Sequence, residues 1–530
     1  MVPFADSCLV KQCIEKSVEG AELIPFLPEI KKHTFEKPCW IHLGSGNIFR
    51  SFIAELAQKL IKNKYTDKGI IVADTYDGEI IEKIYKPYDN LFLSCVLNPN
   101  GNFDLKLISS VTEALAPNLN QQDLDRFFYC FTQQSLQIVS LSVTEKAYEL
   151  YDVNGNFLPW LEQDLNKEFN QVNGILSLLL RALQKRFDAG KFPLTLLAFD
   201  NCYHNGDKLK HSIYKLAELF LQKEKITSDF YNWITSDAVS FPLSMIDKIT
   251  PHPTLQVQNE LIKRGFTDIE IIKTAKNSVI APFVNSEPAA YLVIEDNFCN
   301  GRPDFEKAGV IITSRENVIL CENMKIETCL NPLQTALAIF GILFEYKYIS
   351  DCVSDPLLHK LVVKMVEEGM AVVQDPHVIN PKNFADEVIN LRLPNKYIFD
   401  QPYRIATDST NKINIRCGLT IKKYGKANLN KNDLVAVPLV IAAFIRYLQG
   451  TSDVGNKFEL ASDLKIDYLK HIGKELNSPK AVQALDEILS NEEIIGCNLK
   501  NEGMYDTVKD MYLKMQKTHG IKSTLAQYLS

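Results

Sequence analysis

The chain has 530 residues, of which 46% are hydrophobic and 23% charged, and it carries a formal net charge of −7 with a pI near 5.8. These values are typical of an ordinary globular protein, and the length predicts two large domains. The acidic balance argues against a role in binding nucleic acid or a membrane surface.

The N-terminal residues MVPFADSCLVKQCIEK lack a basic region that leads into an apolar core, so they do not predict a secretory signal. The longest apolar stretch, 434–445, is about twelve residues long and contains Pro438, which predicts a buried helix rather than a membrane span. Twelve cysteines are scattered without a CxxC pair, as thiols are in a reducing compartment. We therefore expect a cytoplasmic protein.

Alternating strands and helices dominate the first part of the chain. A preamble of helix and loop over residues 1–36 precedes a buried strand at 39–43, a Gly-Ser-Gly turn, a helix at 47–62 and a second strand at 69–73. Apolar, β-rich runs follow at 136–143 and 194–199, separated by helical segments. This order predicts an α/β fold with a Rossmann-type domain that contains a parallel, doubly wound sheet.

The turn between the first strand and the first helix favours a dinucleotide site. Gly44 and Gly46 allow the backbone to approach a pyrophosphate, which the following helix N-terminus, beginning at Asn47, would stabilise. Asp74, at the end of the second strand, is placed to bond the adenosine ribose, although Asp77 competes for that role. The third glycine of the usual fingerprint is absent, and a plain strand-to-helix turn also accounts for the pattern.

Strand signals become sparse after residue 318, and long helical periodicities take over at 332–346, 356–370 and 434–448. Beyond residue 455, charges alternate with leucines, as in helices that cover a surface. We therefore predict a dinucleotide-binding domain over residues 1–318 and a mostly α-helical substrate and catalytic domain over residues 319–530.

One segment of the second domain, ENMKIETCLNPLQ at 322–334, brings several reactive side chains together. Asn331 and Pro332 predict a helix start, with asparagine as the cap and proline in the first turn. Lys325 lies on the segment that enters this helix, and a lysine held among amides and apolar groups can lose its proton near neutral pH and act as a base. Taken alone, the same pattern fits a solvated lysine before an ordinary helix.

Further segments then indicate a family. IHLGSGNIFR, FDNCYHNGDKLK, SMIDKITP, VIEDNFCNGRPDFEKAGV, the lysine segment and YRIATDSTNK follow one another between residues 38 and 450. In this order they resemble the mannitol dehydrogenase family of polyol-specific long-chain dehydrogenases and reductases, which includes fructuronate and tagaturonate reductases. The resemblance implies a Rossmann-type domain followed by a helical domain, and a nicotinamide cofactor. Asp74, placed to bond the adenosine ribose hydroxyls, favours NAD over NADP as that cofactor. The resemblance also implies that the enzyme needs no metal.

The resemblance assigns catalytic roles to four residues. Lys325 matches the general base of alcohol oxidation, and Glu322 matches the acid that guards proton exit from it. Asn201 and Asn331 match the two asparagines that hold the reacting oxygen. Chemistry agrees with these roles, because hydride leaves a secondary alcohol only as the hydroxyl proton departs, so base and oxyanion donors must meet at one oxygen.

The resemblance also assigns substrate contacts. Arg404 and Lys412, eight residues apart, match groups that bind substrate hydroxyls, and Asp247 matches a further acid of the active site. Both cations are also able to pair with a carboxylate, so they do not choose between a polyol and a sugar acid. Gln334 stands where the family has a histidine, and an amide bonds a hydroxyl without changing its protonation state.

Two functions therefore remain open. The first is an NAD(P)-dependent oxidoreductase that interconverts a polyol or aldonate with its ketose or ketouronate, as for mannitol and fructose or mannonate and fructuronate. The second is a degenerate relative that binds cofactor or sugar without useful turnover. The spacing from Lys325 to Asn331 is one residue longer than in mannitol dehydrogenase, which predicts a bulge or a looser turn around Cys329.

Other chemistries are poorly supported by the sequence. The nine histidines form no HExxH pair, and neither a P-loop nor a GxSxG motif is present. The one YxxxK, from Tyr505 to Lys509, lies in a charged helical stretch far from the glycine turn, and we interpret it as chance. The expected partner is a small-molecule polyol or sugar acid, and the sequence leaves the oligomeric state open.

Overall fold

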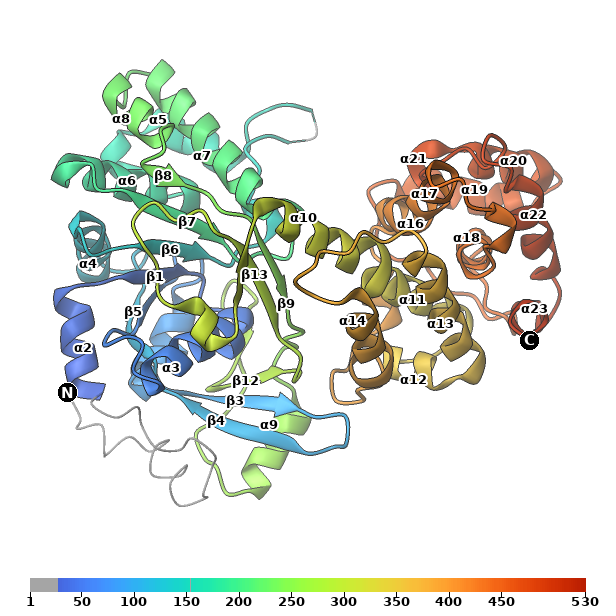
Figure 1. Cartoon of the computed structure of the whole chain (residues 1–530), viewed down its shortest axis with the longest axis horizontal. Helices are drawn as coiled ribbons and strands as arrows, with labels where there is room; N and C mark the ends of the chain where they lie inside the picture. The colour runs from blue at the N-terminus through green and yellow to red at the C-terminus, as the bar shows by residue number, and fades with distance from the viewer. Residues whose placement is uncertain (1–26, 153) are drawn as a thin grey trace. The chain divides into compact units, whose positions relative to one another are not determined.

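The computed structural model describes residues 27–152 and 154–530, which form two compact units. Unit 1 contains the chain up to Asn98 together with Asn102–Ile319, and unit 2 contains Pro99–Gly101 and Leu320–Ser530 (Figure 1). Most of the expected preamble, residues 1–26, lies outside the described residues, and its remainder forms helix α2, Leu27–Glu36.

The centre of unit 1 is a six-stranded sheet with the order β5-β2-β1-β6-β7-β8, in which every pairing is parallel. The chain moves outward from β1 through β2 to one edge and then returns to the other side of β1 with β6. This reversal is the topological switch point of a doubly wound sheet, as predicted. The strands are β1 (Trp40–Leu43), β2 (Ile70–Ala73), β5 (Val111–Leu115), β6 (Ile138–Leu141), β7 (Leu194–Ala198) and β8 (Val239–Ser240).

Both faces of this sheet are buried. Successive side chains of a strand point to opposite faces, so Ile71 and Ala73 join one apolar core while Ile70 and Val72 join another. The first core includes α4 (Gln121–Thr132), α6 (Ile175–Gly190) and α7 (Asn205–Gln222), and the second includes α3 (Ala54–Lys62). Burial on both faces explains why β1, β2, β6 and β7 are mostly apolar without a polar alternation, whereas β5 contains Thr112 and the half-buried Glu113.

Smaller sheets complete unit 1 and were not predicted. One has the order β12-β3-β4, one has the order β14-β13-β9, and β10 pairs with β11. Their bounds are β3 (Phe92–Leu97), β4 (Phe103–Ile108), β9 (Ser244–Asp247), β10 (Ile272–Lys273), β11 (Val279–Ile280), β12 (Phe283–Ser286), β13 (Tyr291–Glu295) and β14 (Ile311–Thr313). The remaining α-helices of this unit are α5 (Pro159–Asn166), α8 (Ser228–Ile234) and α9 (Leu255–Lys263).

Unit 2 is built from helices around α11 (Asn331–Leu343), α13 (Pro356–Met370) and α18 (Ala436–Tyr447), of which α18 is buried along its whole length. The others are α12 (Ile349–Ser354), α14 (Pro381–Glu387), α15 (Pro402–Ile405), α16 (Ser409–Ile413), α17 (Leu419–Lys426), α19 (Ile466–Leu476), α20 (Ala481–Ser490), α21 (Glu492–Ile495), α22 (Tyr505–Lys514) and α23 (Gly520–Tyr528). Helix α10, Arg315–Met324, leads into this unit.

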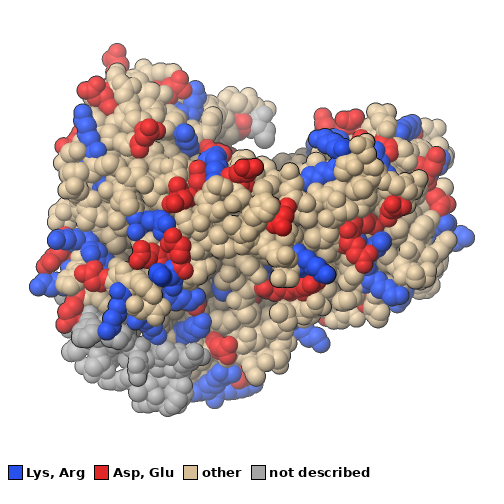
Figure 2. Space-filling model, viewed as in Figure 1, with Lys and Arg blue, Asp and Glu red and all other residues tan. Residues whose placement is uncertain are grey.

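The continuous helical stretch Arg315–Leu343 is long and apolar enough to cross a membrane by length and composition. However, 78% of its most apolar window is buried inside the protein, as in a core helix. On the face shown in Figure 2, Lys and Arg are interspersed with Asp and Glu, without a large patch of either sign.

Candidate active site

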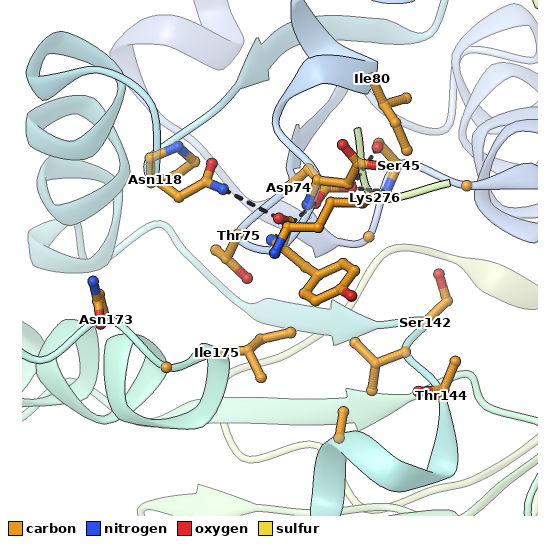
Figure 3. Close-up of a pocket in the computed structure, with 18 of the residues that line it drawn as sticks. Ser45, Asp74, Thr75, Ile80, Asn118, Ser142, Thr144, Asn173, Ile175 and Lys276 are labelled. Atoms are coloured by element: carbon orange, nitrogen blue, oxygen red, sulfur yellow. Dashed lines mark hydrogen bonds between the residues drawn. The ribbon is translucent and has the colours of Figure 1, made fainter. Parts of the chain in front are cut away.

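A large cavity lies in unit 1 at the carboxyl ends of the central strands. Its lining includes Gly44 after β1, Asp74 after β2, Ser142 after β6 and Phe199 after β7. The volume is about 1710 Å³, more than the 300–1,000 Å³ typical of small-molecule sites, so an extended dinucleotide has room. Figure 3 shows Ser142 on the opposite side of the cavity from Asp74.

The two glycines of the turn serve different purposes. Gly44 has φ +111°, and a Cβ there would lie 2.5 Å from the carbonyl oxygen of Ser142, so the fold itself requires glycine. A Cβ on Gly46 would meet no protein atom within 4 Å, and Gly46 lines the cavity. A side chain at Gly46 would therefore take space from a ligand rather than from the protein, which fits the close approach of a pyrophosphate.

The carboxylate of Asp74 links the glycine turn after β1 to the loop after β2. Its Oδ2 accepts hydrogen bonds from the backbone N–H (3.2 Å) and hydroxyl (2.5 Å) of Ser45. Its Oδ1 accepts from the backbone N–H groups of Tyr76 (3.0 Å) and Asp77 (2.6 Å). Four donors occupy the two oxygens of this buried group, so its first function in the fold is to hold the glycine turn against the end of β2.

Asp77, the other acid considered for the ribose, also accepts hydrogen bonds within the protein. Its Oδ2 accepts from the hydroxyls of Thr274 and Ser278, each at 2.6 Å. Asn47, the other residue expected at the cofactor, donates from its side chain to the carbonyl of Pro251 at 3.3 Å. Asn47 is not among the residues that line the cavity, whereas Asp77 is.

A buried histidine orients one wall of the cavity. His42, in the middle of β1, bonds the hydroxyl of Ser140 through Nδ1 (2.7 Å) and that of Ser142 through Nε2 (2.8 Å). Its ring also stacks on Phe49 and Phe199. Burial lowers the pKa of His42 to about 3, so the imidazole is neutral and fixes the Ser142 hydroxyl beside the cavity.

Asn201 lines the cavity on the loop after β7 and is exposed. The preceding residue, Asp200, accepts hydrogen bonds from the backbone N–H of Val143 and the hydroxyl of Tyr148. Burial raises the pKa of Asp200 to about 7. Asp200 thus ties the loop that carries Asn201 to the loop after β6.

Asn205 fixes the same region, although the sequence did not single it out. Its buried amide nitrogen donates to the carbonyls of Ala198 (3.2 Å), Asp200 (3.0 Å) and Ser244 (2.9 Å), and its oxygen accepts the N–H of Ser244 (3.1 Å). Asn205 therefore joins the end of β7 to the start of β9. Its only signal in the sequence was a second asparagine four residues after Asn201.

Asp247 is the last residue of β9 and is buried. Its neighbours Ile246 and Lys248 line the cavity, and Asp247 does not. Lys248 donates to the carbonyl of Glu287 at 2.9 Å, and burial lowers the pKa of Lys248 to about 8. Lys248 is thus a basic residue in the lining of the cavity that the sequence analysis did not identify.

In unit 2, Lys325 and Glu322 are both buried and lie three residues apart, on one face of the same helical stretch. Lys325 begins a π-helical turn, Lys325–Cys329, in which the N–H of Leu330 donates to the carbonyl of Lys325 at 3.2 Å. A π-turn inserts one residue into a helix. It occupies the segment where the longer spacing predicted a bulge.

Helix α11 begins directly after this turn. Asn331 is its first residue and makes no capping hydrogen bond, so the prediction that Asn331 caps the helix was wrong and Leu330 is the N-cap. The reason is that the π-turn runs directly into α11. Asn331 and Gln334 are the only residues of α11 that are not buried, and their spacing places them on one face.

The predicted substrate cations differ in their surroundings. The side chain of Arg404 is 67% exposed and pairs with Asp400. Lys412 is half-buried, and its ammonium donates to the carbonyls of Ile405 (2.7 Å) and Thr407 (2.5 Å) at the end of α15. Burial lowers the pKa of Lys412 to about 8, with a further contribution from the positive charge of Arg416, which the sequence reading missed.

Within residues 27–152 and 154–530, no group of three or more His, Cys, Asp or Glu side chains is placed to hold a metal ion. Of the predicted site residues, Gly44, Gly46, Asp74 and Asn201 line one cavity in unit 1. Lys325, Glu322, Asn331 and Gln334 share one helical segment of unit 2.

Comparison with known proteins covers nearly the whole chain. A model of the mannitol dehydrogenase Rossmann domain matches residues 39–307, and a model of the mannitol dehydrogenase C-terminal domain matches residues 317–516. A D-mannonate oxidoreductase from Thermotoga maritima is 43% identical over 495 residues, which are 92% of each chain.

Two solved structures share the fold. One is a D-sorbitol dehydrogenase in substrate-free form, with a TM-score of 0.81 and 22% identity, covering 97% of this chain and 99% of that one. The other is Pseudomonas fluorescens mannitol 2-dehydrogenase in a ternary complex with NAD and D-mannitol, with a TM-score of 0.70 and 24% identity. The second match covers 93% of this chain and 94% of the other.

Proposed function

The chain belongs to the mannitol dehydrogenase family, and on that premise we propose that it is an NAD-dependent oxidoreductase that interconverts D-mannonate and D-fructuronate. The family resemblance stated from the sequence is thereby confirmed. The chain is a secondary-alcohol dehydrogenase of polyols or sugar acids. We propose further that its substrate is a sugar acid, D-mannonate. The observation that carries this assignment is the 43% identity to a D-mannonate oxidoreductase over 92% of both chains.

The cavity of unit 1 is the proposed cofactor site. Gly46 leaves space at the helix N-terminus for the pyrophosphate, and Asp74 holds the turn in place. When bound, the nicotinamide supplies the hydride acceptor. The chain's own residues then have to bind the alcohol, accept its proton and stabilise the oxygen.

Lys325 is the proposed general base. In its neutral form it accepts the hydroxyl proton, and Asn331 donates a side-chain hydrogen bond to the oxygen as negative charge develops. Asn201 is the proposed second donor, and amides suit this role because they are not consumed as acids. Glu322, on the face of Lys325, is the proposed acceptor that passes the proton onward.

Gln334 stands where the family has a histidine, and we propose that this position serves to bind and orient the substrate rather than to transfer a proton. It remains accessible beside Asn331 while the rest of α11 is buried, so its amide is available to a substrate hydroxyl. This position supports a working enzyme over the degenerate relative. The proposed location is the cytoplasm, and the partner is a small-molecule polyol or sugar acid.

A substrate panel tests this function. The purified protein is assayed with D-mannonate, D-mannitol and other aldonates and polyols, each with NAD and then NADP, in the presence of a metal chelator. We expect the highest kcat/KM with D-mannonate and NAD, and the reverse reaction with D-fructuronate and reduced cofactor. A clear preference for polyols would contradict the sugar-acid assignment, and no turnover on any substrate would favour the degenerate relative.

A further inference from the structure

Three cations gather in unit 2 beside the proposed catalytic helix. Arg404 lies on α15, Lys412 on α16, and Arg416 on the π-helical turn Asn414–Gly418 that continues α16. The positive charges of Arg416 and Arg404 both help to lower the pKa of Lys412. Both arginines therefore repel the ammonium of Lys412, and the carboxylates of Asp408 and Asp463 offset part of this repulsion.

Arg416 is fixed to the first turn of α11. Its Nη1 donates to the carbonyl of Asn331 at 3.1 Å and to the hydroxyl of Thr335, and that hydroxyl donates to the same carbonyl at 3.0 Å. The guanidinium thus sits on the turn that presents the side chains of Asn331 and Gln334. A cation at a helix N-terminus meets the positive end of the helix dipole, so this placement does not serve the stability of α11.

Arg416 has no carboxylate partner among the described residues, in contrast to Arg404, which pairs with Asp400. The Nε and Nη2 atoms of Arg416 make no hydrogen bond with any described residue. They are also not among the fully buried side-chain atoms that lack a partner. Burial lowers the pKa of Arg416 to about 10. The guanidinium remains charged at neutral pH, and no described residue occupies its Nε and Nη2 donors.

We infer that Arg416 binds the carboxylate of the substrate through its Nε and Nη2 groups and thereby selects a sugar acid over a neutral polyol. An arginine fork matches a carboxylate with two parallel hydrogen bonds, whereas a hydroxyl uses only part of it. The anion also offsets the repulsion that Arg404 and Arg416 exert on Lys412. This inference rests on the proposed function and names the residue that decides its substrate class.

The test compares two substrates in one variant. D-mannonate and D-mannitol differ at the carboxylate, so their ratio of kcat/KM isolates its recognition. Arg416→Ala is expected to lower the mannonate-to-mannitol ratio at least 30-fold, mainly through KM for mannonate, as truncating one partner of a hydrogen-bonded charge pair does. Arg416→Lys keeps the charge but loses the fork, and it is expected to restore the ratio only in part.

Controls separate binding from folding. Lys480→Ala removes a surface cation of the same unit that lies 3.6 Å from Glu475, and the ratio should not change. If Arg416→Ala does not fold, Arg416→Lys carries the test with an expected fall in the ratio of about tenfold. Equal losses on both substrates would show a structural role for Arg416 and overturn the inference.

The wild-type assay distinguishes this inference from the function on which it rests. A wild-type enzyme that oxidises D-mannitol but not D-mannonate would overturn carboxylate selection and leave a family dehydrogenase in place. A wild-type enzyme that oxidises neither substrate would overturn the proposed function itself.

Discussion

Asp74→Asn is a sharp test of the cofactor site, because the carboxylate is nearly isosteric with an amide but accepts twice as many hydrogen bonds. Asp74 accepts from Ser45 through one oxygen and from the N–H groups of Tyr76 and Asp77 through the other. An amide replaces one oxygen with a donor, so two of the four bonds are lost. At about 1.5 kcal/mol each, the lower end for bonds to a charged group, the loss is about 3 kcal/mol.

The expected result is a lower melting temperature by several degrees and a weaker affinity for NAD, because the Gly44–Gly46 turn loses its anchor. Differential scanning calorimetry and a fluorescence titration with NAD measure the two effects. Asp77→Asn is the matched control. Its partners are the hydroxyls of Thr274 and Ser278, which can rotate to accept from an amide, whereas a backbone N–H cannot. If Asp74→Asn cost no more than Asp77→Asn, the reasoning would be refuted.

Two further predictions concern the substrate groups of unit 2. Gln334→His should keep turnover within about tenfold of wild type, because a neutral hydrogen bond contributes about 0.5–1.5 kcal/mol; a large rise in kcat with a new titration near pH 6.5 would instead show that wild type lacks a proton relay. For Lys412, whose pKa is about 8, KM for a sugar acid should rise as pH increases through 8 and the ammonium loses its charge, and Lys412→Arg should flatten that profile. Deprotonation of Lys412 weakens substrate binding but stabilises the fold. Above pH 8 the unfolded lysine binds more protons than the folded one, so the free energy of unfolding rises with pH through this group. A KM independent of pH in wild type would contradict the role of Lys412.

Four strands of the central sheet, β1, β2, β6 and β7, were predictable because each is a short, mostly apolar run that is buried on both faces. The other two were not predicted, because β5 contains Thr112 and Glu113 and β8 spans only two residues. The strand, the Gly44-Ser-Gly46 turn, the helix and Asp74 appear in the structure in the predicted order, with Asp74 directly after β2. The pairing of β3 with β12 was not predictable from local pattern, because the two strands lie nearly two hundred residues apart in the chain. Such a pairing depends on the tertiary fold rather than on propensity. The antiparallel pairs β3–β4 and β10–β11 are local, but they were not predicted.

The sequence placed the candidate site residues on strands, turns and helices, but it did not show their hydrogen bonds. The sequence placed Asp74 at the end of β2, yet only the structure shows four donors on its carboxylate. It predicted a bulge near Cys329 from spacing, yet assigned the cap of α11 to Asn331 because a π-turn that runs into a helix has no local signature. Arg416 was missed because its hydrogen-bond partners, Asn331 and Thr335, lie more than eighty residues earlier in the chain.

The most direct test of the central claim is the turnover of Lys325→Ala with D-mannonate, measured together with its dissociation constant for NAD. The account predicts a fall in kcat of at least a hundredfold, because positioned acid–base groups contribute 10²–10⁴-fold, with partial rescue by added primary amines. NAD should still bind, because every residue that lines the proposed cofactor cavity belongs to unit 1 and Lys325 is not among them. A variant that retains more than about a tenth of wild-type turnover would contradict the assignment of Lys325 as the general base.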